Sequence, residues 1–179
     1  MVTIRQERTA DLGAREALLE AAYGPTRFRK PSARLRSGRK PAAGLSLVAV
    51  EGGAIVGTVR LWEVSAGTAG LVLLLGPLAV HPDFRRRGIG SALMRHALSE
   101  AYRRDHGAVL LVGDADYYGR FGFSAEPTGR LWLPGLDAPH RLLGCELRPG
   151  ALAGAQGQIA APRFSPRVRR APSPAPQAA

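Results

Sequence analysis

Cysteine is nearly absent from this sequence, and so are long apolar runs. A single cysteine, Cys145, occurs in 179 residues, which excludes a framework of internal disulfides, and no Cys/His cluster has the spacing of a structural zinc site. No apolar run approaches the roughly 20 residues that cross a membrane, and the first residues, MVTIRQERTADLG, lack the apolar core of a signal peptide. We therefore expect a soluble, cytoplasmic protein without a membrane or metal partner.

Acidic residues are also scarce, and most of the basic excess is arginine. The sequence holds 25 Lys and Arg residues against 14 Asp and Glu, and only Lys30 and Lys40 are lysines. Residues 24–50 contain no acidic residue and these basic ones: Arg27, Arg29, Lys30, Arg34, Arg36, Arg39 and Lys40. Such a cluster is the electrostatic footprint of phosphate binding, but a coding bias toward arginine gives the same composition. We favour a solvated basic face, and an anionic ligand or nucleic acid remains the alternative.

The composition changes near residue 162. The final stretch, RFSPRVRRAPSPAPQAA, is rich in Pro, Ala and Ser and poor in large apolar side chains. Such a stretch buries too little apolar surface to offset the conformational entropy that it would lose on folding. We therefore expect one folded domain over residues 1–161 and a disordered Pro/Ala/Arg-rich tail over residues 162–179.

Periodicity predicts a mixture of strands and helices. Apolar residues recur at helical spacing in the ranges 12–23, about 88–104 and 115–121, and Asp11 is a candidate N-cap of the first helix. Runs typical of strands are residues 2–8, 45–50, 55–62, 71–80, 108–112, 131–133 and 142–147, with a hairpin turn at 51–54. Pro77 cannot donate to a ladder, so the 71–80 strand should bulge or splay at Gly76-Pro77. The order predicts an α/β sheet covered by helices, with Trp62 and Trp132 in its core.

The most informative stretch is HPDFRRRGIGSALM, residues 81–94. Gly88 and Gly90 allow close approach to the backbone, the first N–H groups of the following helix lack internal partners, and the arginines at 85–87 add positive charge. Together these features suit a pyrophosphate. The GxGxxG fingerprint fails because Leu93 takes the last glycine position, and no Gly-Lys-Ser/Thr of a P-loop occurs. On the glycines alone, a solvated basic turn that starts a helix explains the pattern equally well.

Two motifs in this chain resemble those of one family. Residues 85–90, RRRGIG, match the acetyl-CoA signature Arg/Gln-x-x-Gly-x-Gly/Ala of the GNAT superfamily of N-acetyltransferases. LAVHPDFRRRGIG is similar to the family segment in which a bulged strand precedes the pyrophosphate turn. YYGRFGF resembles the second motif, with Tyr118 four residues before Gly122-Phe123. The resemblance covers residues 2 to about 150.

The resemblance implies a mixed, mostly antiparallel sheet of about seven strands, helices on both faces, a splayed central cleft, and acetyl-CoA as co-substrate. The amides of Leu78 and Val80 would follow the pantetheine arm, one of them polarising the thioester carbonyl, and the amides of residues 87–91 would hold the pyrophosphate. The implied cofactor-binding residues are Leu78, Ala79, Val80, Arg85, Arg86, Arg87, Gly88, Ile89, Gly90 and Ser91. Tyr118 matches the position that gives a proton to the leaving sulfur, and simple packing of this ring is the alternative.

The sequence does not single out a general base. An amine of pKa about 10 must lose a proton before it attacks. Glu63, Asp114, Asp116 and His81 are candidates, each with an ordinary structural role as well, and some family members use ordered water instead. Cys145 lies in an apolar strand pattern that indicates a buried small residue, so we expect no covalent acyl-enzyme.

We therefore expect direct transfer of the acetyl group of acetyl-CoA to a primary amine, with a small molecule favoured as acceptor. One alternative is a protein or tRNA acceptor held by the basic segment 27–40, and another is a non-catalytic sensor that binds acyl-CoA. Acceptor pockets in this family are built from variable segments, here 23–44 and 126–140, which carry no interpretable motif. Because dimers are common in the superfamily, the resemblance also allows a homodimer.

Overall fold

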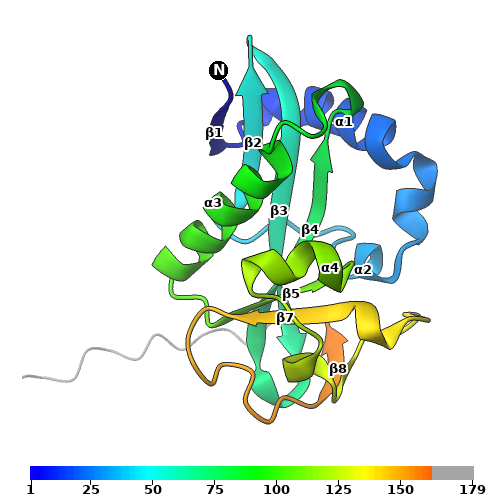
Figure 1. Ribbon diagram of the computed structural model, residues 1–179. Coiled ribbons are helices and arrows are strands. Elements are labelled where there is room, and N and C mark those ends of the chain that lie inside the picture. The colour runs from blue at the N-terminus through cyan, green and yellow to red at the C-terminus, as the bar shows by residue number, and fades with distance from the viewer. Residues whose placement is uncertain (163–179) are drawn as a thin grey trace, which may run out of the picture.

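An eight-stranded sheet runs through the computed structural model, which describes residues 1–162 (Figure 1). The strands are β1 Thr3–Gln6, β2 Ser46–Glu51, β3 Ala54–Ala66, β4 Leu71–Val80, β5 Ala108–Val112, β6 Leu131–Trp132, β7 Leu142–Glu146 and β8 Gly157–Ala160. The helices are α1 Leu12–Tyr23, α2 Pro31–Arg34, α3 Ile89–Arg103 and α4 Ala115–Tyr118. The predicted tail, residues 162–179, lies outside the described residues from 163 onward.

The main path of the sheet runs β1-β2-β3-β4-β5-β7, while β8 pairs with β3 and β6. The β4–β5 and β6–β8 pairings are parallel, and the others are antiparallel. This confirms the expected mixed, mostly antiparallel sheet. The strand that sequence analysis missed is β8, whose four residues, GQIA, are too few to show an alternating pattern.

Helices cover both faces of the sheet. In Figure 1, α3 crosses the face formed by β2 and β3, and it buries Ile89, Leu93, Met94, Ala97 and Ala101. These residues recur three or four positions apart, so they share one side of the helix. On the other face, Leu18 and Leu19 of α1 pack against Ala79 of β4. No helix within residues 1–162 combines the length and the apolar character needed to span a bilayer.

β4 has a neighbour on its β5 side for only part of its length. The parallel pairing ends where Leu74 lies opposite Leu110. The ladder between β3 and β4 is interrupted around Gly76-Pro77, where β4 contains one residue more than β3. This is the bulge expected from a proline that cannot donate a hydrogen bond. Beyond it, β4 and β5 are no longer paired.

Two expectations about single side chains differ from the structure. Trp62 is buried and its indole N–H donates to the Gly76 carbonyl at 2.7 Å. Trp132 is 53% exposed, because successive side chains of a strand point to opposite faces and its neighbour Leu131 takes the buried face of β6. Asp11 precedes α1 without capping it through its side chain. Its carboxylate instead binds the Arg5 guanidinium at 2.6 and 2.9 Å.

A buried ion cluster ties the start of the chain to the sheet. Glu7 follows β1, and its side chain is only 8% exposed. It accepts hydrogen bonds from Arg15 of α1 at 2.9 Å, from Arg60 of β3 at 2.8 Å and from the Ser46 hydroxyl of β2. Burial by itself raises the pKa of Glu7, but the hydrogen bonds from Arg60 and Ser46 and the charges of both arginines outweigh it, so this pKa lies below its usual value.

Replacing Glu7 by Gln should destabilise the fold by about 3 kcal/mol at neutral pH, because it removes the carboxylate that pairs with Arg60 and leaves the buried Arg15 with Glu16 alone. Since the folded-state pKa of Glu7 lies below the unfolded value of about 4.3, this contribution is complete above about pH 5 and is lost as the pH falls through the folded-state pKa. Denaturant unfolding of Glu7→Gln and wild type across this range measures the effect.

The matched control is Asp105→Asn, which makes the same chemical change at the exposed pair of Asp105 with Arg148. It should alter stability by less than about 1 kcal/mol. A Glu7→Gln deficit that stays constant as the pH falls would contradict the assignment.

Candidate functional site

The free edge of β4 presents backbone amides to the space between β4 and β5. The amide of His81 donates to the Val56 carbonyl of β3 at 2.9 Å, and successive N–H groups point to opposite sides of a strand. The amide of Ala79 therefore also faces β3. The amides of Leu78 and Val80 face the opposite, open side, where β5 has separated from β4.

Tyr23, the last residue of α1, reaches this edge. Its hydroxyl donates to the Leu78 carbonyl, 55 positions away in the chain. Its ring also lies under the Lys30 ammonium, with Nζ 4.5 Å from the ring centroid. Tyr23 begins the expected acceptor segment 23–44, but the sequence assigns it no role of its own, because nothing in the local pattern indicates a contact over such a separation.

β4 leads through the 3-10 turn Pro82–Phe84 into the N-terminus of α3. Gly88 caps the helix with a φ of 74°, a left-handed conformation that favours glycine. The amide of Ala92 donates to the Gly88 carbonyl at 3.0 Å, so the amides of residues 88–91 have no partner within the helix. These N–H groups carry the positive end of the helix dipole.

A cavity of about 350 Å³ opens beside these amides. It is lined by Val80, Phe84, Arg85, Arg86, Gly88, Ile89, Gly90, Ser91, Tyr117 and Arg120. A side chain at position 90 would crowd it, since a Cβ built on Gly90 would lie 3.2 Å from the Tyr117 hydroxyl. Converging N–H donors beside several guanidinium groups have the chemistry of a phosphate site.

The three consecutive arginines of the motif do different things. Arg85 and Arg86 line the cavity, whereas Arg87 turns away and binds the Glu51 carboxylate at the β2–β3 hairpin through two contacts of 2.7 Å. Arg120, in the turn after α4, lines the cavity as well. It lies inside the second motif, YYGRFGF, but sequence analysis did not single it out. Arg87 thus anchors the loop, and Arg120 adds charge from the other wall.

α4 places Tyr118 at the wall of the cleft opposite β4. Its ring lies over Gly113, where an added Cβ would come within 2.3 Å of the ring, and it meets the Phe123 ring edge-on at 6.1 Å between centroids. Burial, together with the neighbouring tyrosines, raises the pKa of Tyr118 to about 12. The hydroxyl is therefore protonated at neutral pH, in the same small cavity that Leu78 lines.

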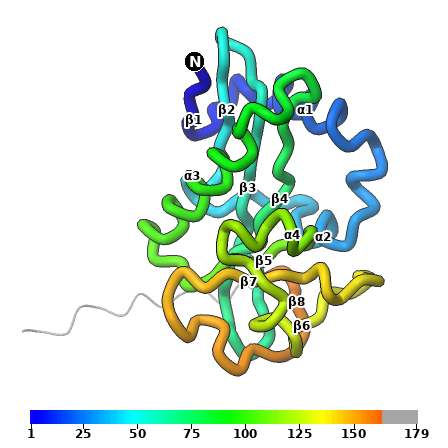
Figure 2. Tube along the Cα trace, viewed as in Figure 1, coloured from blue at the N-terminus to red at the C-terminus, as the bar shows by residue number. Residues whose placement is uncertain are grey.

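That small cavity, of about 90 Å³, follows the larger one along the edge of β4. It is lined by Tyr23, Arg27, Lys30, Ser32, Arg36, Leu75, Gly76, Pro77, Leu78, Leu111, Val112 and Tyr118. Segments far apart in the sequence form it: α2 and the turn before it lie beside α4, over the bulged middle of β4 and the end of β5 (Figure 2). The expected acceptor segment 23–44 thus contributes one wall.

None of the four base candidates lines the small cavity. The Asp114 carboxylate caps α4 by accepting from the Asp116 amide at 3.1 Å, and both residues are exposed. The His81 ring accepts from the Asp83 amide at 3.3 Å. Glu63 is exposed on β3, level with the part of β4 that still pairs with β5. In the described part of the chain, the lining of this cavity offers tyrosine hydroxyls but no carboxylate or imidazole.

Cys145 is remote from this chemistry. Its thiol lies in the core under α3, is 8% exposed and lines neither cavity. Burial raises the pKa of the thiol, and the charge of Glu146 raises it further, so the reactive thiolate is disfavoured. Among residues 1–162, no group of three or more His, Cys, Asp or Glu is placed to hold a metal ion.

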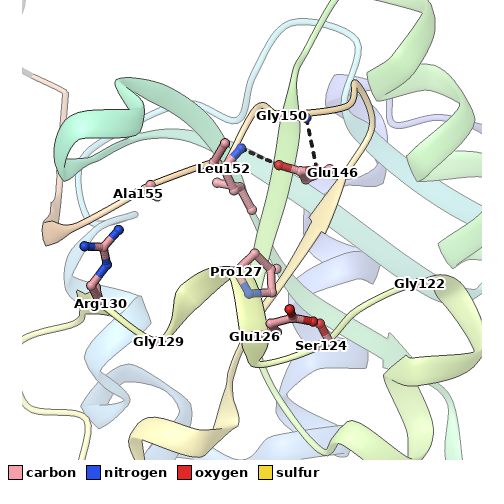
Figure 3. A pocket seen from close by; sticks show the side chains of 13 residues that line it. Gly122, Ser124, Glu126, Pro127, Gly129, Arg130, Glu146, Gly150, Leu152 and Ala155 are labelled. Carbon is pink, nitrogen blue, oxygen red and sulfur yellow. Dashed lines mark hydrogen bonds between the residues drawn. The ribbon is translucent and has the colours of Figure 1, made fainter.

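A wider cavity, of about 590 Å³, lies between the segment after α4 and the loop that precedes β8 (Figure 3). Its Glu146 carboxylate accepts from the amides of Gly150 at 3.1 Å and Leu152 at 2.6 Å, drawn as dashed lines in Figure 3. Glu126 and Arg130 are exposed and do not point toward one another in this view. Because its polar groups stabilise a loop or face solvent, we place the candidate site along β4 instead.

One family model matches about half of the chain. Residues 42–125 match the model described as the acetyltransferase (GNAT) domain. The matched range contains both motifs, the free edge of β4 and Tyr118. No curated protein matches the sequence at a significant level.

Solved structures share the fold over most of their length. A GNAT family N-acetyltransferase from Escherichia coli, solved in complex with CoA, has a TM-score of 0.75 and 26% identity over 89% of this chain and 89% of that one. A GNAT family acetyltransferase from Brucella melitensis, solved in complex with acetyl-CoA, has a TM-score of 0.68 and 28% identity over 89% of this chain and 95% of that one. The ribosomal-protein-S18-alanine N-acetyltransferase from Escherichia coli, 22% identical with a TM-score of 0.54, covers 83% of this chain and 95% of its own and shares the fold alone. With its two motifs, its domain match over residues 42–125 and this shared fold, the chain contains an acetyltransferase (GNAT) domain.

Proposed function

We propose that this protein transfers the acetyl group of acetyl-CoA directly to a primary amine. The observation that carries the proposal is the series of free backbone N–H groups along one wall, from Leu78 and Val80 of β4 to residues 88–91 of α3. An extended arm that contains amides can pair with a free strand edge, and a diphosphate suits a helix N-terminus flanked by arginines. The related chains solved with CoA and with acetyl-CoA support this arrangement.

The residues at the strand edge suit direct attack by the amine. As the C–N bond forms, the thioester oxygen gains negative charge, and the amide of Leu78 or Val80 would stabilise it. As the C–S bond breaks, the Tyr118 hydroxyl would donate a hydrogen bond to the leaving sulfur. Because the pKa of Tyr118 is about 12 and that of a thiol is roughly 8.5, this hydrogen bond stabilises the thiolate before any proton moves. The products are an amide and CoA, and the proton lost by the amine passes to water.

Calorimetry with acetyl-CoA tests the proposal. Wild type should bind with a Kd of roughly tens of micromolar or tighter, and Gly90→Leu should abolish binding because the new side chain enters the cavity toward Tyr117. The matched control is Gly13→Leu, in the exposed first turn of α1, where nothing lies within 4 Å of an added Cβ. An absence of binding by wild type contradicts the proposal, and full binding by Gly90→Leu would show that the coenzyme binds away from α3.

The variant Tyr118→Phe should keep acetyl-CoA affinity and lower kcat about 100-fold, since it removes only the hydroxyl that meets the leaving sulfur. The measurement is thiol release during acetylation of a panel of amines. Tyr102→Phe, at a tyrosine that is 51% exposed on α3, is the control and should leave kcat unchanged. An unaltered kcat in Tyr118→Phe would mean that the Tyr118 ring has only a packing role. Tight acetyl-CoA binding with no thiol release for any amine would instead identify an acyl-CoA sensor.

A further inference from the structure

Positive charge gathers in the small cavity beside Tyr118. Arg27, Lys30 and Arg36 line it, and within the described residues its lining contains no acidic side chain. Like charges near a protein surface repel one another by several kcal/mol at close range, so three cations around one small space need an explanation. The three side chains differ in how they are neutralised.

Arg27 already has its counter-ions. Its guanidinium binds Glu16 at 2.7 Å and Glu20 at 3.0 Å, both on α1. It also lies over the Phe28 ring, 4.4 Å from the centroid. Arg27 therefore fixes the segment before α2 to α1 and offers little charge to the cavity.

Arg36, just after α2, makes no ion pair with any residue of the described chain. Its Nη2 reaches the Ser32 hydroxyl only at 3.5 Å, the limit of a hydrogen bond. Its Nη1 lies against β4, 3.1 Å from where a Cβ on Gly76 would be. Burial lowers the pKa of Arg36 to about 10, so the guanidinium is desolvated and still charged at neutral pH.

Lys30, the third cation of the lining, and Arg141, a cation close to it, form no ion pair within residues 1–162. Burial lowers the pKa of Lys30, and the charges of Arg36 and Arg141 lower it further. The three cations therefore repel one another electrostatically. Arg141 approaches from the far side of the cleft, where its Nε donates to the Gly113 carbonyl at the end of β5 at 3.3 Å. An anion placed among them would turn this repulsion into attraction.

We infer that the acceptor amine carries a carboxylate, bound by Arg36 and Lys30 at the end of the cleft, an inference that rests on the proposed acetyl transfer. A guanidinium presents parallel N–H donors that match the two oxygens of a carboxylate. The cavity of about 90 Å³ equals about three water volumes, which suits a carboxylate with a few carbons. Because Tyr118 lines the same cavity, an amine a few bonds from the carboxylate would lie near the thioester. The substrate class is therefore small amino carboxylates.

Matched acceptors test the substrate class. For each of several amino acids, thiol release is compared among the amino acid, its carboxamide and its decarboxylated amine. The carboxylate form should have a kcat/KM about tenfold or more above the two forms that lack the carboxylate. Equal or better acetylation of the forms without a carboxylate, a preference for aminoalkyl phosphates, or acetylation confined to RNA or protein would overturn the inference.

The variant Arg36→Gln tests the residue. It should lower kcat/KM for amino carboxylates about tenfold or more, mainly through KM, so that their advantage over amines without a carboxylate is lost, and it should leave acetyl-CoA affinity unchanged. Arg34→Gln is the matched control, because Arg34 lies two residues earlier, is exposed and does not line the cavity. Lys30→Gln, at an exposed position, should reduce carboxylate selectivity in the same direction and serves if Arg36→Gln fails to fold.

Thermal unfolding separates a binding role from a structural one. Since Arg36 is a desolvated charge without an ion partner, Arg36→Gln should melt at or above the wild-type temperature. A lower melting temperature with unchanged selectivity would make Arg36 structural and overturn its role. A lack of acetyl-CoA binding would remove the proposed function and this inference together, whereas binding and transfer without carboxylate preference would remove the inference alone.

Discussion

β4 keeps its hydrogen bonds to β5 only as far as Leu74, and the bulge at Gly76-Pro77 directs the rest of the strand away from that neighbour. Unpaired N–H groups in a cleft are unfavourable unless water, a side chain or a ligand satisfies them. Tyr23 satisfies the Leu78 carbonyl on this edge, but the amides of Leu78 and Val80 stay open. The proposed coenzyme site, the position of Tyr118 across the cleft and the cationic acceptor cavity all depend on this separation.

Local chemistry in the sequence was enough to predict the bulge of β4 and the glycine turn that starts α3. The bulge follows from the missing N–H of Pro77, and the turn follows from Gly88 at the start of an amphipathic helix. The strands 71–80 and 108–112 have the predicted bounds, because apolar β-rich runs with sharp flanking breaks leave little choice of register.

Contacts between distant residues were beyond such reasoning. Arg87 pairs with Glu51 instead of joining Arg85 and Arg86, and nothing in three consecutive arginines distinguishes the one that turns away. Trp132 was expected in the core, but it lies on the outer face of β6, opposite to its buried neighbour Leu131. The wall of the small cavity formed by α2 likewise depends on where the segment after α1 packs, which no local pattern encodes.

The basic segment shows how one compositional signal hides several roles. Arg27 binds glutamates of α1, Arg39 donates to the carbonyls of Leu35 and Glu63 at 2.6 Å each, and Arg36 enters the small cavity. The remaining side chains of the expected solvated face are exposed, and Lys30 alone of these four lines the small cavity: Arg29, Lys30, Arg34 and Lys40. Charge counting alone gives equal weight to all of them, whereas burial and pairing single out Arg36, which has no ion partner among the described residues.

The central claim is that free main-chain amides along β4 and at the start of α3 hold the coenzyme. The most direct measurement is a heteronuclear NMR titration of the backbone amides with CoA. The account predicts that the largest changes fall on Leu78, Val80 and residues 88–91. Changes concentrated instead around Glu146 and the loop Gly150–Ala155, at the wider cavity, would contradict it.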